Sequence, residues 1–152
     1  MGWTGSDDIP TDAEIRAAFA GVVSDTTRAV AADAAQLAPV DTGALEASLY
    51  ATGPQGSGYG AAVGAMKARN ANVPAEPELR LDDYDGDGVI IGAVDSAAPY
   101  ADLIHDGHFN VRANRHIAGR PFLANAMQGQ KDGFESRQAN ALRKLGCKKV
   151  VK

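Results

Sequence analysis

The strongest pattern in the chain is an apolar stripe with helical spacing near the N-terminus. It is formed by Ile15, Phe19, Val22, Thr26, Val30, Ala34 and Leu37. Steps of three and four residues place these side chains on one face of an α-helix. Thr11 and Glu14 have the spacing of a capping box, and Pro39 cannot continue a helix. The pattern therefore predicts a long helix that begins after Thr11 and ends before Pro39.

A second helical stripe lies near the C-terminus and begins at Pro121. It is formed by Leu123, Met127, Phe134, Ala141 and Leu145. Gly129 and Gly133 each weaken a helix by about 1 kcal/mol relative to alanine. We therefore expect a kink or break near them, and we expect Gly146 to end the helix.

Shorter elements are predicted between the two stripes. Turn-forming residues at Asp41-Thr42-Gly43 precede one helical turn and then the β-prone Leu49-Tyr50-Ala51. Pro99 can occupy the first turn of a short helix that ends at Gly107.

A β-hairpin is predicted further along the chain. Leu79-Arg80-Leu81 and Val89-Ile90-Ile91 flank an acidic segment that contains glycine, which is a pattern typical of two strands with a polar connection.

Two stretches show no sustained period, and they complete the predicted organisation. We expect residues 53–77 to form a long mobile loop and residues 109–120 to be irregular. The fold class is then α+β, with a long N-terminal helix and a C-terminal helix packed on a small antiparallel β-sheet with long loops. We expect a flexible N-terminal arm at residues 1–10, a single domain at 11–146 and a basic C-terminal tail at 147–152.

Composition and charge narrow the function classes. The chain has 152 residues, 45% of them hydrophobic, which suits one domain with its own core. A formal net charge of −4 argues against a dedicated nucleic-acid binder. Nine carboxylates and one basic residue lie between Glu76 and Asp106, whereas seven basic and two acidic residues lie between Lys131 and Lys152. The acidic and basic regions can pair head to tail between neighbouring subunits of a ring. Alternatively, they are a solvated acidic loop and a solvated basic tail, which is the more common explanation for a run of like charges.

The number of cysteines and the hydropathy of the chain indicate the cellular compartment that we expect for the protein. Cys147 is the single cysteine, so no internal disulfide can form, which fits a reducing cytoplasm. No apolar run approaches the roughly 18 residues that span a bilayer, and the N-terminus lacks a secretion signal. We expect a soluble protein without a membrane partner.

One short motif suggests a metal. Asp83, Asp85 and Asp87, followed by Gly88, match the first half of a calcium loop. Position twelve of that loop is Val94, which cannot supply the bidentate carboxylate. The motif therefore favours a hairpin turn and leaves a weak calcium candidate.

No set of residues indicates catalysis. His105, His108 and His116 lack the spacing of a zinc site. There is no Gly-x-Ser-x-Gly elbow, and Cys147 has no obvious base beside it. We therefore predict that the chain is not an enzyme and has no cofactor.

Three segments, in this order and spacing, resemble a known family. They are Ala38 to Ser48 (APVDTGALEAS), Pro99 to Gly107 (PYADLIHDG) and Ala118 to Ala126 (AGRPFLANA). Together they resemble the tail-component and neck proteins of long-tailed double-stranded DNA bacteriophages. The positions that carry the resemblance are Pro39, Asp41, Thr42, Gly43, Leu45, Ser48, Tyr100, Ala101, Gly107, Pro121, Phe122 and Leu123. The chain departs from the family pattern at His105, where a Glu is usual, and at Asp106 and His108.

The resemblance implies a structural virion protein at the head–tail junction, made in the host cytoplasm and acting by assembly. Its partners would be copies of itself in a cyclic ring, six- or twelve-fold, and neighbouring connector, stopper, tail-terminator or tail-tube proteins, with DNA passing nearby. One alternative is a tail terminator that caps the tail tube. Another is a small calcium-dependent binding module. The motif residues are turn formers and core anchors, so we expect the interfaces to lie in loops and charged regions.

Overall fold

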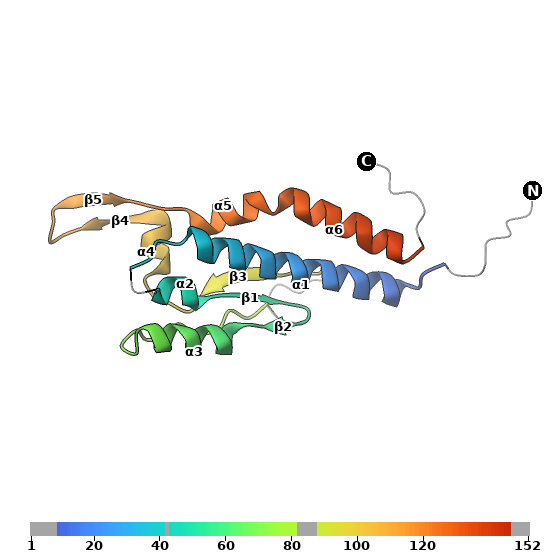
Figure 1. The fold of residues 1–152 in the computed structure, drawn as a ribbon, viewed down its shortest axis with the longest axis horizontal. Coiled ribbons are helices and arrows are strands. Elements are labelled where there is room, and N and C mark those ends of the chain that lie inside the picture. Colours follow the sequence, from blue (N-terminus) through green and yellow to red (C-terminus); the bar gives the residue numbers. More distant parts are fainter. Residues whose placement is uncertain (1–8, 42, 82–87, 147–152) are drawn as a thin grey trace, which may run out of the picture.

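The computed structural model of the protein describes residues 9–41, 43–81 and 88–146 (Figure 1). Its central element is helix α1, Asp12–Leu37. The Thr11 side chain accepts a hydrogen bond from the Glu14 amide at 3.3 Å, and the Glu14 carboxylate accepts one from the Thr11 amide at 2.7 Å. This capping box and the helix end before Pro39 confirm the predicted first helix.

The main sheet lies against one side of α1. Helix α2, Ala44–Ser48, leads into strand β1, Leu49–Gly53, which is central in the order β2-β1-β3. Strand β2 is Gly56–Ser57 and strand β3 is Ala93–Ser96, and both pair antiparallel with β1. The predicted strand at Leu49–Ala51 is thus confirmed.

The hairpin predicted from Leu79–Leu81 and Val89–Ile91 is wrong, because neither run is a strand. The Leu79 amide donates to the Tyr50 hydroxyl at 2.9 Å instead of joining a ladder. At Gly92 the chain passes so close to α1 that a Cβ there would lie 2.5 Å from the Thr27 side chain. Strand pairing begins at Ala93, and the partner strand is β1.

The predicted loop at 53–77 is also wrong over much of its length, because it contains helix α3, Tyr59–Arg69. Ala62 and Met66, four residues apart, are its buried positions. Gly60 and Gly64 face open space, so the helix tolerates them although they weaken its sequence pattern.

The chain then forms a short helix and a second hairpin. Helix α4, Ala101–Asp106, ends at Gly107 as predicted. Strands β4, Gly107–Asn110, and β5, Arg115–Ala118, form a two-stranded antiparallel sheet where an irregular stretch was predicted. Asn114, with φ of 45°, supplies the left-handed turn residue between them.

The C-terminal stripe forms two helices, α5 at Phe122–Gly129 and α6 at Lys131–Lys144. The predicted break occurs at Gln130, between the two weakening glycines. Figure 1 shows the layers: α5 and α6 lie on α1, α1 lies on the sheet, and α3 covers the opposite side of the sheet. The fold is α+β with a long N-terminal helix, and the C-terminal helices pack on α1. Within the described ranges, no helix has both the length and the apolar character needed to cross a membrane.

Candidate functional site

The three motif segments meet in one buried junction. Leu45, Ala101 and Phe122, one from each segment, belong to the same core cluster and are 4%, 6% and 2% exposed. Tyr100 and Leu123 pack against this cluster. The segments are distant in sequence, so this junction ties α2, α4 and α5 to the C-terminal end of α1.

A buried pair of serines reinforces the junction. The Ser48 hydroxyl donates to the Leu45 carbonyl at 2.7 Å and lies 2.7 Å from the Ser96 hydroxyl. The Ser96 oxygen also accepts from the Ala98 amide at 3.1 Å. Since Ser48 is fully buried, every polar atom of the pair needs these partners.

Other motif residues shape turns at the rim of the junction. Gly43 and Gly107 have φ of 75° and 85°, the left-handed region that glycine adopts without strain. Asp41 and Pro121 are exposed, and Pro39 is half-buried. Burial, together with the charge of Asp41, raises the pKa of Tyr100, so its hydroxyl stays protonated. Thr42 lies outside the described residues.

The junction holds the base of the β4–β5 hairpin, which projects from one end of the molecule (Figure 1). The chain leaves the junction after α4 and returns to it at α5, where the Arg120 amide donates to the Ile104 carbonyl at 2.9 Å. His108 and Ile117 are paired on one face of the hairpin, and Phe109 and His116 on the other.

The hairpin exposes apolar and basic side chains together. Phe109 is 55% exposed and Val111 at the tip is 82% exposed, and Leu103 on the neighbouring α4 is 51% exposed. Arg112 and Arg115 are also exposed.

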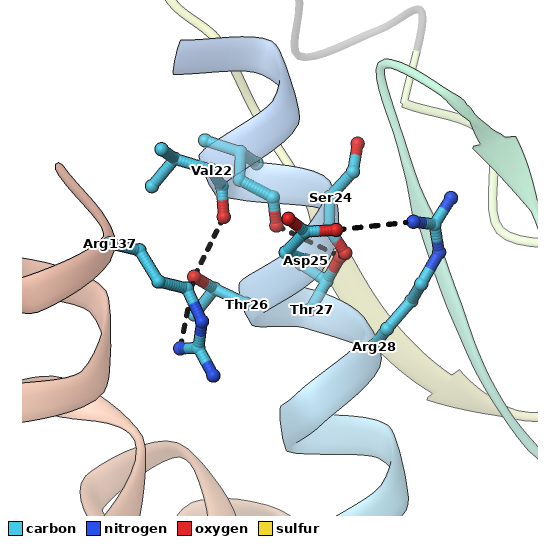
Figure 2. A network of polar contacts seen from close by, with 8 residues as sticks. Val22, Ser24, Asp25, Thr26, Thr27, Arg28 and Arg137 are labelled. Atoms are coloured by element: carbon cyan, nitrogen blue, oxygen red, sulfur yellow. Dashed lines mark hydrogen bonds and ion pairs between the residues drawn. The ribbon is translucent and has the colours of Figure 1, made fainter. Parts of the chain in front are cut away.

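An apolar groove of about 700 Å³ opens between α1, the segment before β3 and the C-terminal helices. Its apolar lining includes Val23, Val30, Ile90, Leu123, Met127 and Phe134. Arg137 of α6 crosses to α1 near it, with its guanidinium 3.5 Å from the Thr26 hydroxyl (Figure 2). Met127 is 68% exposed although it lines the groove.

A second hollow, of about 470 Å³, lies between α1, the β1–β2 turn and α3. Ser24 lines it, and its hydroxyl is buried and has no hydrogen-bond partner in the structure. In Figure 2 the Ser24 side chain points away from the Thr26–Arg137 contact. The other lining residues are mostly glycine, alanine and serine.

The histidines do not gather into a metal site. His105 is bonded to Asp106 at 2.6 Å, His108 approaches the Leu103 carbonyl at 3.2 Å, and His116 lies on the opposite face of the hairpin. Over 9–41, 43–81 and 88–146, no group of three His, Cys, Asp or Glu side chains is arranged to hold a metal ion. The calcium candidate Asp83, Asp85 and Asp87 lies outside these ranges.

Tyr50, a residue of the central strand β1, has a strongly raised pKa. Burial, with a smaller contribution from Asp95, raises the pKa of Tyr50 to about 12, although the Leu79 amide opposes this shift. The Tyr50 hydroxyl donates to the Asp95 carboxylate at 3.3 Å, and its ring meets that of Tyr59 edge to face at 5.4 Å. The protonated Tyr50 hydroxyl therefore links β1 to Asp95 of β3 and to the segment at Leu79 through hydrogen bonds.

The projecting hairpin and the groove are the surfaces that sequence reasoning missed. The hairpin left a weak signal, since His108–Asn110 and Arg115–Ile117 are flanked by Gly107 and Gly119 and are joined through Asn114. The groove left none, because it forms from residues that three distant segments bring together. Comparisons with protein-family models, with curated proteins and with solved structures give no match for this chain.

Proposed function

We propose that this chain is a structural subunit of the head–tail junction of a long-tailed bacteriophage, and that it acts by assembling with copies of itself into a ring. One observation carries the proposal. The three motif segments that resemble the neck and tail-component family occur in the family's order, and they converge on one junction around Leu45, Ala101 and Phe122. Their buried positions support the structural role that the resemblance implies for these segments.

The geometry supports an assembly role in a second way. A ring with cyclic symmetry needs two different surfaces on each subunit, one facing each neighbour. The β4–β5 hairpin with Phe109 and Val111 and the groove that contains Met127 are two such surfaces, and they lie on different parts of the fold. The hairpin exposes Phe109 and Val111, and the groove is lined largely by apolar side chains, as interaction surfaces often are.

Deletion of the gene from the phage genome tests the proposal. Infection without the protein should yield DNA-filled heads and separate tails, and the wild-type chain supplied in trans should restore joined particles. The control is Gly64→Ala, which changes an exposed position of α3 that faces open space and should restore joining equally. If heads and tails join normally without the chain, the proposal is wrong.

The same infection separates a neck protein from a tail terminator. A terminator stops polymerisation of the tail tube, so its loss should produce tails of variable length. Loss of a neck protein should leave tails of uniform length that carry no head. We expect the second result, and electron microscopy of the lysate measures it directly.

A further inference from the structure

Within the part of the chain that the structure describes, the β4–β5 hairpin has little to pack against. Among the described helices and strands, its substantial contacts are between the two strands and with α4. Isolated two-stranded hairpins are marginally stable in water. Phe109 and Val111 nevertheless remain exposed on it. The hairpin therefore has the properties of an arm that completes its packing on another molecule.

The charge of the hairpin indicates the kind of molecule on which it would complete its packing. Residues 107–118 contain two of the chain's 15 basic residues and none of its 19 acidic ones, so the rest of the chain, with 13 basic residues left, has a formal net charge of −6. A hairpin of charge +2 is therefore attracted to the body of a second copy. The exposed Phe109 and Val111 beside the arginines favour a protein surface as the partner, because a nucleic-acid phosphate backbone has no apolar surface on which they could be buried.

The body also offers a matching site. The groove between α1, α5 and α6 is lined by apolar side chains. At its edge, the Asp33 carboxylate accepts a 2.6 Å hydrogen bond from the amide nitrogen of Gln130, which lines the groove and whose amide oxygen accepts from Arg137 at 3.1 Å. Asp33 makes no direct ion pair with any of the described residues. Since Lys131 also lines the groove, an incoming arginine would have to lie at the Asp33 edge, where it would pair directly with this half-buried carboxylate.

We infer that the hairpin of one copy docks in the α1–α5–α6 groove of a second copy, with Phe109 and Val111 in the groove and Arg112 or Arg115 facing Asp33. The contact uses different surfaces on the two copies, so it is heterologous and propagates head to tail. The inference deepens the ring assembly proposed above and rests on it, because it names the two surfaces that would meet in the ring.

Mixing two defective variants provides the test. The hairpin variant is Phe109→Ser with Val111→Ser, and the groove variant is Ala124→Glu with Met127→Glu; all four positions are exposed, so both proteins should fold. Sedimentation should show that the wild type self-associates and that each variant alone is weakened about tenfold or more. Mixed together, the two variants should form a one-to-one dimer, because one intact hairpin and one intact groove remain.

Charge variants extend the test. Arg112→Glu with Arg115→Glu should weaken association, and Asp33→Asn should do so to a smaller extent. Arg143→Glu, on an exposed part of α6, is the matched control and should not. Circular dichroism of every variant checks that a loss of association is not a loss of fold.

Three results would overturn the inference: variants that associate as the wild type does, a mixture that stays monomeric, or a monomeric wild type that instead binds duplex DNA through Arg112 and Arg115. None of them bears on whether heads join tails in an infection without the chain. Failure of the docking inference and failure of the proposed function are therefore distinguishable.

Discussion

The backbones of Gly107 and Gly119 meet at the base of the hairpin. A Cβ on Gly107 would lie 2.6 Å from the amide nitrogen of Gly119, and a Cβ on Gly119 would lie 2.5 Å from the His105 carbonyl oxygen. Both obstacles are backbone atoms, which cannot move aside as the end of a flexible side chain can. The angle at which the hairpin leaves the motif junction is therefore set by two residues without side chains.

The first prediction concerns this contact. Gly119→Ala should lower the free energy of unfolding by about 1–3 kcal/mol, because it overpacks a backbone contact. Gly64→Ala is the matched control, because it lies within α3 and faces open space, and it should raise stability by about 0.5–1 kcal/mol. Chemical denaturation of both variants measures the difference. Equal effects of the two substitutions would show that the close approach at the hairpin base does not constrain the fold.

The second prediction separates core from surface with two phenylalanines. Phe122 is 2% exposed in the motif junction, whereas Phe109 is 55% exposed on the hairpin. Phe122→Ala should cost about 3–5 kcal/mol of unfolding free energy. Phe109→Ala should change it by only about 0.5 kcal/mol while weakening self-association. Thermal unfolding and sedimentation of the two variants measure these effects, and a large loss of stability from Phe109→Ala would mean that Phe109 belongs to the fold of the single chain.

The elements that could be predicted from the sequence are those with strong local signals. The capping box at Thr11 and Glu14, the stop at Pro39 and the glycine that ends α4 are each decided by a few neighbouring residues. The break between α5 and α6 was also predictable, since two glycines four residues apart flank it. In each case the local chemistry and the tertiary fold agree.

Other elements depend on contacts that no local pattern contains. Helix α3 buries only Ala62 and Met66, and its remaining alanines and glycines resemble a loop in composition. The Val89–Ile91 run looks like a strand, but Val89 is 54% exposed, Ile90 and Ile91 line the groove, and pairing with β1 begins only at Ala93. Tertiary packing overrode strand propensity at this point.

The third prediction concerns alkaline pH. The pKa of Tyr50 is raised from its ordinary value of 10.0 to about 12, so the protonated form is favoured in the folded state. Its contribution to stability is therefore fully present below pH 10 and is lost as the pH rises from 10 towards 12. Tyr50→Phe removes the titrating group, so the stability gap between the wild type and this variant should narrow over that range. Denaturation series above neutral pH measure the gap, and a gap that does not change with pH would contradict the assignment.

The fourth prediction concerns acid and the start of α1. Hydrogen bonds from the backbone and then the side chain of Thr11 lower the pKa of Glu14 below its ordinary value of 4.5. A carboxylate with a lowered folded-state pKa stabilises the fold above its unfolded value, and the contribution disappears as the pH falls through the folded-state pKa. Glu14→Gln can still accept the Thr11 amide but carries no charge near the positive end of the helix dipole.

The wild type should therefore be more stable than Glu14→Gln at neutral pH, and the two should converge as the pH falls below 4.5. Since Glu14 is exposed, added salt should also reduce the difference, which a contribution from hydrogen bonding alone would not show. Glu135→Gln, on an exposed part of α6 where no hydrogen bond or ion pair to Glu135 is found among the described residues, is the matched control and should leave the stability at neutral pH close to that of the wild type. If Glu14→Gln matches the wild type at neutral pH and low salt, the charge of Glu14 contributes nothing to the cap, and the capping box acts through geometry alone.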